Sequence, residues 1–315
     1  MEFSTILFFG ILVSSVCTVK GAEKMTDLPT CNYPAIYNFG DSNSDTGGIA
    51  AAFYPMAAPC GETYFHRPAG RGSDGRLIID FIDKGGSSRL PRPEDFSKAL
   101  FTLDIGQNDI AAATRSKSIE FQQVTVPNII SQFTAQVRDL YIKGARTFWI
   151  HNTGPIGCLP VSTIKVQDPP PGYLDKHGCI ESQNDMARYF NKQLKVEIVK
   201  LRSELSAAAI IYVDMYSAKY ELISNAKNEG FEDPSKICCG YHGFEYDIFC
   251  GSKGHLNGSE VFAGSCANPS TVISWDGVHY TEAANHWIFK RISNGSLSDP
   301  SINVSQACHT EMVSL

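Results

Sequence analysis

The sequence has no excess of positive charge and almost no long apolar run. Outside residues 6–16, no stretch of the 315 residues is apolar enough to cross a bilayer, which takes about 20 residues. Lys and Arg number 27 against 33 Asp and Glu, so the net charge is −6 and no nucleic-acid partner is indicated. Internal repeats, low-complexity tracts and interdomain linkers are also missing. These absences favour a single globular domain.

The spacing of the cysteines excludes the common zinc motifs. No Cys-x-x-Cys pair occurs, and Cys238 and Cys239 are adjacent, so we expect no metal site. Ten cysteines are nevertheless present, which is typical of a chain that folds in an oxidising compartment. If Cys17 is removed with a signal peptide, nine remain. At least one thiol is then predicted to be free or to pair with another molecule.

The apolar residues 6–16 have the length of the hydrophobic core of a signal peptide. A small-residue cleavage site follows at residues 19–21. We therefore predict a signal peptide at residues 1–21, one mature domain at residues 22–315, and secretion to the extracellular space or cell wall. Because no Lys or Arg precedes the apolar run, a short anchor or a buried helix is the alternative. Three sequons predict glycosylation at Asn257, Asn294 and Asn303.

Short apolar runs alternate with amphipathic stretches along the chain. Strands are predicted at residues 35–39, 99–105, 147–151 and 208–214. Helices are predicted from Ser73 or Asp74 onward and at residues 124–143, 181–205, 215–228 and 281–292, the last capped by Thr281. Residues 229–272 have little periodicity and are expected to be disulfide-braced loops. The alternation predicts an α/β fold, a three-layer sandwich with a parallel sheet.

Polar side chains follow three of the predicted strands, at residues 41–42, 107–109 and 152–153. Active sites of parallel sheets lie at the carboxyl ends of the strands, so these side chains are expected near one another. Ser42 is a candidate nucleophile because a sharp turn after a strand lifts its Oγ clear of the sheet. The alternative is that residues 40–42 form an ordinary turn.

Ester hydrolysis by a serine also needs a base, a group that orients the base, and donors for the oxyanion. Asp276 and His279 are three residues apart in a late loop and can supply the orienting group and the base. The side-chain amide of Asn108 can donate to an oxyanion, or Asn108 can be a turn residue. Asp45 is expected to be a turn or cap residue, and Asn152 either faces the substrate or caps a strand.

Three short blocks resemble the GDSL-type esterase/lipases of the SGNH hydrolase superfamily, in particular the secreted plant branch. They are residues 39–47 (FGDSNSDTG), 106–109 (GQND) and 276–280 (DGVHY), with weaker likeness at 70–76 and 151–158. The resemblance spans about residues 31–292. It implies a flavodoxin-like sheet and hydrolysis of a carboxylic ester, either an acyl lipid or an acetyl ester of a metabolite or of the cell wall. It requires neither cofactor nor metal.

The resemblance also implies a role for each residue of the site. Ser42 Oγ attacks the ester carbonyl, His279 accepts its proton, and Asp276 orients the imidazole. The backbone N–H of Ser42 and the side chain of Asn108 bind the oxyanion. Water then hydrolyses the acyl-enzyme.

One segment expected from the family is short in this chain. Members carry a longer stretch between the positions of residues 82 and 99, which includes the second strand and a glycine that is a third oxyanion donor. Here only residues 83–98 connect the two, so we expect a sheet that lacks one strand. This leaves two further hypotheses open. One is a catalytically impaired pseudo-hydrolase that binds lipid or carbohydrate, and the other is a cell-wall glycosidase using carboxylates such as Asp41 and Asp109.

Overall fold

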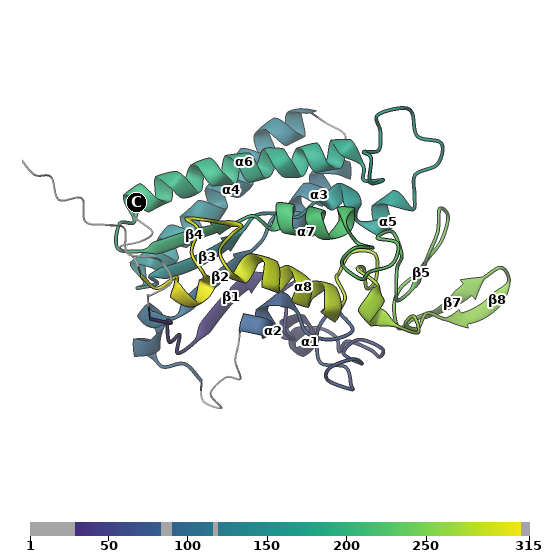
Figure 1. Cartoon of the computed structure of the whole chain (residues 1–315), viewed down its shortest axis with the longest axis horizontal. Helices are drawn as coiled ribbons and strands as arrows, with labels where there is room; N and C mark the ends of the chain where they lie inside the picture. Colours follow the sequence, from purple (N-terminus) through teal and green to yellow (C-terminus); the bar gives the residue numbers. More distant parts are fainter. Residues whose placement is uncertain (1–28, 83–89, 116–118, 310–315) are drawn as a thin grey trace, which may run out of the picture.

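The computed structural model describes residues 29–82, 90–115 and 119–309, and its core is one five-stranded sheet (Figure 1). The strand order is β1-β2-β3-β4-β9, in which the first four strands are parallel and β9 is antiparallel to β4. The strands are β1 (Ile36–Gly40), β2 (Leu100–Asp104), β3 (Thr147–His151), β4 (Ala209–Val213) and β9 (Ser298–Asp299). The four predicted strands are confirmed to within one residue at each end, whereas β9 was not predicted.

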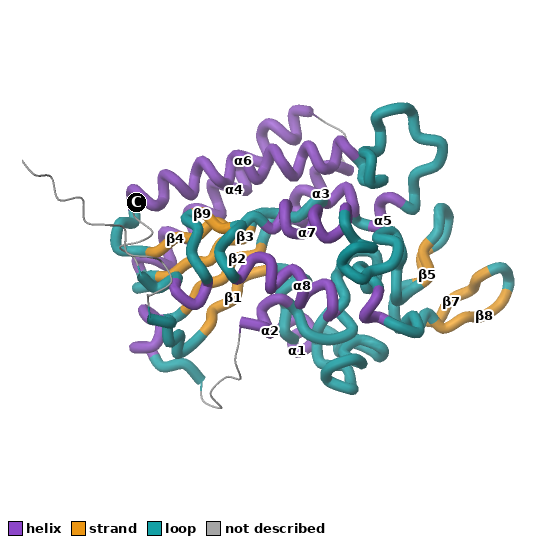
Figure 2. Tube along the Cα trace, in the orientation of Figure 1, coloured by secondary structure: helices purple, strands orange, loops and turns teal. Residues whose placement is uncertain are grey.

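Helices cover both faces of the sheet, so the predicted three-layer α/β sandwich is confirmed (Figure 2). One face packs against α2 (Ile78–Ile82), α7 (Met215–Ser224) and α8 (Glu282–Ser293). The other packs against α3 (Gln107–Arg115), α4 (Ile119–Ile142) and α6 (Glu181–Glu204). All five residues of β3 are buried, which explains the apolar Phe148, Trp149 and Ile150 at its centre. Trp149 of β3 packs on the face covered by α2, α7 and α8, and Phe148 packs on the face covered by α3, α4 and α6.

The predicted helix beginning at Ser73 or Asp74 is wrong in its start. The helix α2 begins only at Ile78, and the side chains of Ser73 and Asp74 bond elsewhere. Ser73 Oγ donates to the carbonyl of Tyr280 at 3.0 Å, and Asp74 Oδ1 accepts the backbone N–H of Glu282 at 2.7 Å. Asp74 therefore caps the first turn of α8. Sequence propensity identified a capping residue but could not show which helix it caps.

The remaining elements are short. Two small helices, α1 (Gly48–Ala52) and α5 (Pro160–Thr163), lie in loops at the carboxyl ends of the strands. The region 229–272, expected to be loops, contains two hairpins, formed by β5 (Tyr241–His242) with β6 (Asp247–Ile248) and by β7 (Lys253–Leu256) with β8 (Ser259–Phe262). The second hairpin projects from the body of the molecule (Figure 1).

Four disulfides brace the described residues. Cys238–Cys266 and Cys239–Cys250 hold the region 229–272 as expected, and Cys158–Cys179 closes the loop before α6. The fourth, Cys31–Cys308, joins positions 277 residues apart. Cys60 is buried and unpaired, in agreement with the prediction that one thiol of an odd set is left over.

β1 lies at one end of the sheet. Within the part of the chain that the structure describes, no strand pairs with its outer edge. Tyr37 is covered by ring contacts with Phe96 and Phe101 at centroid distances of 5.1 Å, whereas Phe39 is 38% exposed. Edge strands offer unpaired backbone groups to other chains, so this edge is a site of potential association.

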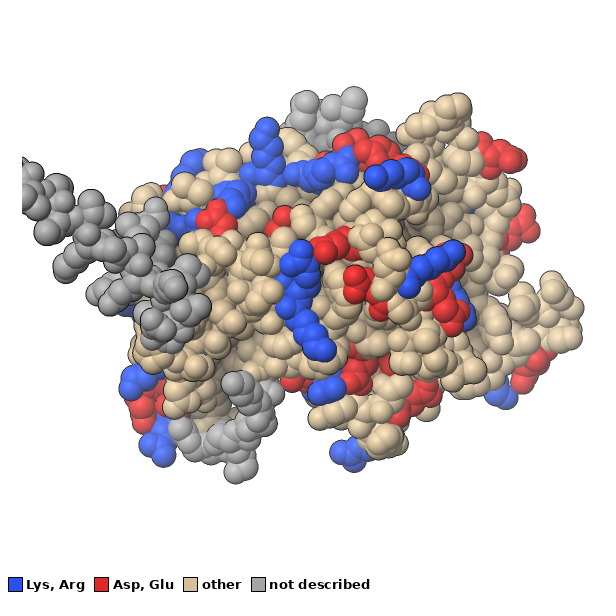
Figure 3. All heavy atoms as spheres, in the orientation of Figure 1, with Lys and Arg blue, Asp and Glu red and all other residues tan. Residues whose placement is uncertain are grey.

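Charges of both signs are mixed on the face drawn in Figure 3, where Lys and Arg side chains gather over α6 among Asp and Glu. No helix of the described residues is long and apolar enough to cross a membrane. Residues 1–28 lie outside the described part, so the expected signal peptide remains a prediction.

Candidate active site

Ser42 lies in a tight turn immediately after β1. The carboxylate of Asp41 accepts the backbone N–H of Asn43 at 2.9 Å, and its carbonyl accepts that of Ser44 at 3.0 Å. Asn38 of β1 donates to the carbonyl of Ser44 at 2.9 Å, which ties the turn back to the sheet. A Cβ at Gly40 would lie 1.9 Å from Ser44 Oγ, so only glycine fits before this turn. These contacts fix the position of Ser42.

Asp276 and His279 occupy one turn of the loop before α8. Asp276 Oδ1 accepts the backbone N–H groups of Val278 at 3.0 Å and His279 at 2.8 Å. Its second oxygen, Oδ2, accepts from His279 Nδ1 at 2.6 Å. The spacing of three residues thus lets one carboxylate hold both the backbone and the ring of the same histidine.

The structure brings Ser42 and His279 together although they are 237 residues apart in the chain. The two atoms Ser42 Oγ and His279 Nε2 are 2.7 Å apart. With Nδ1 donating to Asp276, Nε2 is left as the acceptor for the serine hydroxyl. Ser42, His279 and Asp276 therefore form a continuous hydrogen-bonded chain at the carboxyl end of β1.

Opposing effects determine the pKa values of His279 and Asp276. Burial alone lowers the pKa of His279, but the Asp276 carboxylate and its hydrogen bond outweigh burial, so this pKa lies above its ordinary value. Burial likewise tends to raise the pKa of Asp276, but the charge and hydrogen bonds of His279 hold it below its ordinary value. Asp276 is accordingly ionised at neutral pH, as a residue that orients a histidine base requires.

Asn108 lies at the start of α3, beside the turn that carries Ser42. Its Nδ2 donates to Asp41 Oδ2 at 3.2 Å, and its side chain is exposed. Burial, together with the nearby Asp104 carboxylate, raises the pKa of Asp41, while hydrogen bonds from Asn43 oppose this. The structure therefore places Asn108 beside the serine turn, held by Asp41, and its role as an oxyanion donor stays a prediction.

The segment 70–76 packs against the candidate base. A Cβ at Gly72 would lie 3.4–3.5 Å from three ring atoms of His279, so the backbone here forms a wall against the imidazole. Two ion pairs hold the segment, Arg71 with Asp80 at 2.5 Å and Arg76 with Glu282 at 2.6 Å. In the sequence, residues 70–76 were noted only as part of a family resemblance. In the structure, they pack against the imidazole of His279.

Other polar residues of the sequence analysis have structural partners. Asn152 is buried, donates to the Tyr212 hydroxyl and Asp214, and accepts the backbone N–H of Tyr216, so its side chain joins β3 to β4 and α7. Asp45 accepts the backbone N–H groups of Gly47 and Gly48, which confirms the cap interpretation.

The three sequon asparagines differ in accessibility. Asn257, at the turn between β7 and β8, and Asn294, after α8, are exposed. Asn303 is half-buried, and its Oδ1 accepts from the backbone and the hydroxyl of Ser305.

One group of possible metal ligands occurs among the described residues, formed by Cys31, Cys308 and His309. The two cysteines are joined in a disulfide, so they offer no thiolate to a metal.

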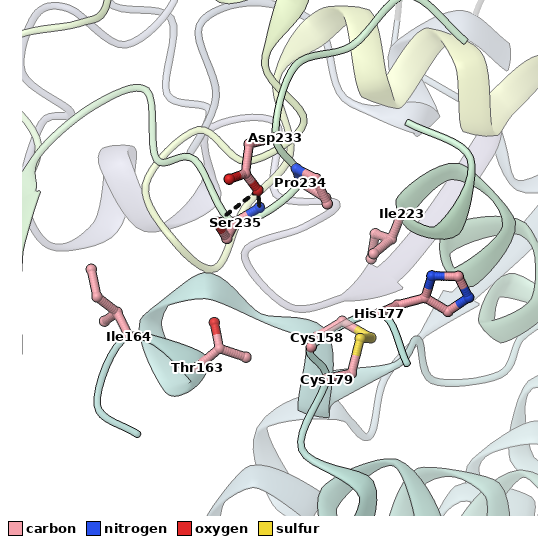
Figure 4. A pocket seen from close by; sticks show the side chains of 10 residues that line it. Cys158, Thr163, Ile164, His177, Cys179, Ile223, Asp233, Pro234 and Ser235 are labelled. Atoms are coloured by element: carbon pink, nitrogen blue, oxygen red, sulfur yellow. Dashed lines mark hydrogen bonds between the residues drawn. A yellow bond between two sulfur atoms is a disulfide. The ribbon is translucent and has the colours of Figure 1, made fainter. Parts of the chain in front are cut away.

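A cavity of about 360 Å³ lies between the loop before α6, the end of α7 and the segment 233–235 (Figure 4). The Cys158–Cys179 disulfide, His177, Ile223 and Pro234 line it. A much smaller second cavity shares Cys158, Ile223 and Pro234 and reaches Val278 and His279. Neither is lined by Ser42 or Asn108, and only the smaller one reaches the acid–base loop.

The fold is an α/β sandwich with a mostly parallel sheet that carries a Ser-His-Asp hydrogen-bonded chain at a strand end, and comparison with known proteins gives the family. The model of the GDSL-like lipase/acylhydrolase family matches residues 86–292, a range that contains Asn108, Asp276 and His279 but not Ser42. The chain therefore belongs to the GDSL-like lipase/acylhydrolase family, whose members support its assignment as a carboxylic ester hydrolase.

Individual plant relatives align over most of the chain. A GDSL esterase/lipase of Arabidopsis thaliana is 44% identical over 368 positions, covering 94% of this chain and 95% of the relative. A protein of Hevea brasiliensis named esterase is 40% identical, covering 89% of this chain and 90% of its own length. A third relative, from Arabidopsis thaliana, is named alpha-L-fucosidase 3 and is 39% identical over 86% of this chain and 92% of its own.

The first of these alignments is longer than the part of the chain it covers. Because 94% of 315 residues is about 296, about 72 of the 368 positions have no counterpart here. A continuous span of that size must also include both Ser42 and His279. This relative therefore has about 72 residues more than this chain within the aligned span, and the place of the missing segment stays a prediction.

Proposed function

We propose that the protein is a secreted serine esterase that hydrolyses acyl-lipid or acetyl esters through Ser42, His279 and Asp276. The observation that carries the proposal is the hydrogen-bonded chain, with 2.7 Å from Ser42 Oγ to His279 Nε2 and 2.6 Å from His279 Nδ1 to Asp276 Oδ2. The first distance suits transfer of the serine proton to His279, and the second suits the hydrogen bond by which Asp276 orients the imidazole.

The reaction proceeds through an acyl-enzyme. His279 Nε2 accepts the hydroxyl proton as Ser42 Oγ bonds to the ester carbonyl carbon, and the carbonyl electron pair moves to oxygen. The C–O bond to the alcohol then breaks, and His279 returns the proton to the leaving alcohol. Water repeats the sequence on the acyl-enzyme and releases the carboxylic acid and Ser42. Asp276 keeps the imidazole oriented and stabilises its charged form throughout.

The oxyanion is stabilised by donors of the serine turn and of α3. Among the described residues, the backbone N–H of Ser42 donates to no protein acceptor, so it is available. Asn108 Nδ2 uses one of its two hydrogens for Asp41 and has the other for the oxyanion. Asp41 thereby positions the amide rather than taking part in the chemistry.

Substitution of the nucleophile tests the proposal. In Ser42→Ala, hydrolysis of p-nitrophenyl acetate should fall by at least about 10³-fold, because no attacking hydroxyl remains. Ser270→Ala, an exposed serine far along the chain, is the matched control and should keep the wild-type rate. Circular dichroism checks that both variants are folded. A Ser42→Ala protein that turns over the ester at the wild-type rate would disprove the mechanism.

A fluorophosphonate probe separates the enzyme from the alternatives. Mass spectrometry should find the probe on Ser42 of the wild-type protein, whereas a pseudo-hydrolase would bind esters without being labelled. One relative is named a fucosidase, so p-nitrophenyl α-L-fucoside is assayed in parallel. Release of nitrophenol from the fucoside that is equal in wild type and Ser42→Ala would favour a glycosidase over an esterase.

We further propose that residues 1–21 are a signal peptide, that residues 22–315 form one secreted domain, and that Asn257, Asn294 and Asn303 carry glycans. Four disulfides in the described residues support folding in an oxidising compartment. Expression in a eukaryotic secretory host should give medium-borne protein that begins near Ala22 and loses mass on treatment with an N-glycosidase.

A further inference from the structure

The acid–base loop before α8 pairs with two adjacent cysteines that take no part in the proposed chemistry. The backbone N–H of Cys238 donates to the carbonyl of Ser274 at 3.1 Å, and the backbone N–H of Cys239 donates to the carbonyl of Trp275 at 2.6 Å. Ser274 and Trp275 are the two residues immediately before Asp276. Two consecutive backbone hydrogen bonds therefore hold the chain where it enters the turn of the candidate acid and base.

The other end of the turn is bonded to the same two residues. The backbone N–H of Trp275 donates to the carbonyl of His279 at 2.8 Å, and Ser274 forms an antiparallel bridge with Tyr280. Because both ends of the turn lie on Ser274 and Trp275, a displacement of these residues moves the carboxylate of Asp276 and the imidazole of His279 together. The backbone that pairs with the cysteines thus sets the position of the acid and the base relative to the serine turn.

Both cysteines are anchored by disulfides to the two stems of the hairpin that projects from the body of the molecule (Figure 1). Cys239 is joined to Cys250, which precedes β7, and Cys238 is joined to Cys266, which follows β8. The backbone N–H of Cys266 also donates to the carbonyl of Cys238 at 2.7 Å. Two covalent bonds, one at each stem of the hairpin, therefore brace the segment that pairs with the acid–base loop.

The side chains of the two cysteines pack closely against the residue before Asp276. Trp275 and Cys239 have no exposed surface, and Cys238 is only 4% exposed. These three side chains belong to one apolar cluster, which also includes Val272. Close-packed interiors transmit displacements because they hold little free volume to absorb them. A shift of the cysteines would therefore be passed on to Trp275 and to the turn that follows it.

We propose that Cys238 and Cys239, with their disulfides, are positioning residues of this site, which hold the acid–base loop where His279 can accept the proton of Ser42. Neither cysteine touches the reacting atoms, and each acts through the backbone that precedes Asp276. A displacement of about 1 Å at a reacting group can lower a rate by about 10²-fold, so a small movement of this loop affects catalysis. The inference rests on the proposed function, since it assumes that His279 is the base.

Removal of each disulfide tests the proposal. In the Cys239→Ser, Cys250→Ser variant, kcat for p-nitrophenyl acetate should fall by about 10–10²-fold, because the loop loses one of its two anchors, while KM should change by less than about 2-fold. The rate at which a fluorophosphonate probe labels Ser42 should fall by a similar factor, because labelling needs the same base. The Cys238→Ser, Cys266→Ser variant should behave in the same way.

The disulfide between the ends of the domain gives the matched control. Among the described residues, no hydrogen bond joins Cys31 or Cys308 to the acid–base loop. The Cys31→Ser, Cys308→Ser variant should therefore keep kcat within about 2-fold of the wild type, at a temperature where circular dichroism shows every variant to be folded. This variant is nevertheless expected to lose the most unfolding free energy, since its bond closes the longest loop. Opposite orders of activity and stability would distinguish positioning from general stabilisation.

The proposal is overturned if the folded Cys239→Ser, Cys250→Ser variant keeps the wild-type kcat and labelling rate. It is also overturned if the activity losses of the three variants follow their losses of unfolding free energy. If neither variant at the hairpin stems folds, graded reduction of the wild-type protein with dithiothreitol decides, with the open bonds identified by alkylation and mass spectrometry. Turnover that persists after the bonds of Cys238 and Cys239 have opened overturns the proposal.

Failure of the proposed function gives a different result. Turnover would then survive in Ser42→Ala, whatever the state of the disulfides. Failure of the positioning role alone would leave turnover that depends on Ser42 but is unchanged by loss of either bond.

Discussion

At the residue scale, the proposed ester hydrolysis depends on Ser42, His279 and Asp276, which are positioned by backbone contacts. Gly40 allows the turn that presents Ser42, and the two backbone bonds to Asp276 orient its carboxylate toward His279. The resulting pKa of His279 is raised because the charges nearby outweigh burial. In the proposed mechanism, the pH dependence of the rate therefore depends on Asp276, which does not touch the substrate.

The raised pKa gives a prediction for Asp276→Asn. The wild-type base is active only when deprotonated, so kcat/KM should rise with pH through a value above 6.5, the ordinary pKa of histidine. Asn removes the charge that raises this pKa while burial still lowers it, so the acid limb should move to lower pH. The rate should also fall by about 10³–10⁴-fold, because the imidazole loses its orientation. A pH–rate profile with p-nitrophenyl acetate measures both effects, and an unmoved limb would contradict the assignment of Asp276.

At the element scale, α8 positions the acid–base loop through its first turn. Thr281 is fully buried, accepts the backbone N–H of Ala284 at 3.2 Å and donates to the carbonyl of Val272 at 2.6 Å. Asp74 and Arg76 hold the next residue, Glu282, from the segment that walls the histidine. The N-terminus of α8 therefore joins the loop that carries Asp276 and His279 to the segment 70–76.

Loss of the Thr281 hydroxyl should weaken this junction. Thr281→Ala leaves one helix N–H and one buried carbonyl without a partner, so the free energy of unfolding should fall by about 2 kcal/mol. Urea denaturation followed by tryptophan fluorescence measures the change. Thr281→Ser keeps the hydroxyl and should lose less than half as much. Equal losses in the two variants would show that the methyl group, not the cap, carries the effect.

At the scale of the whole molecule, disulfides close loops of very different size. Cys31–Cys308 spans 277 residues and Cys239–Cys250 only 11. In the chain-entropy account, a cross-link stabilises by restricting the unfolded chain, and the restriction grows with the logarithm of loop length. The disulfide that joins the ends of the domain should therefore contribute most.

Replacing each pair by serine tests this expectation. The Cys31→Ser, Cys308→Ser variant should lose about 3 kcal/mol more unfolding free energy than Cys239→Ser, Cys250→Ser, from the ratio of the two loop lengths. Guanidinium denaturation under non-reducing conditions gives both values. If the short-loop variant loses as much or more, native-state contacts around Cys239 rather than chain entropy determine the stabilisation.

Much of the fold and the candidate site could be predicted from the sequence by itself. Apolar runs of five to seven residues gave the four parallel strands, since buried strands need continuous apolar sequence. The local spacing of Asp276 and His279 and the glycine before Asp41 and Ser42 encode turns that close over a few residues. Features of this kind can be predicted from the sequence because they depend only on residues that are neighbours along the chain.

The tertiary structure decided what depends on distant contacts. It brings Ser42 within hydrogen-bond distance of His279, and it shows that Asp74 caps α8 and not α2. It also shows that the buried Asn152 bonds to Asp214. Coulomb interactions and hydrogen bonds depend on distance in space, and only folding brings these groups within that distance.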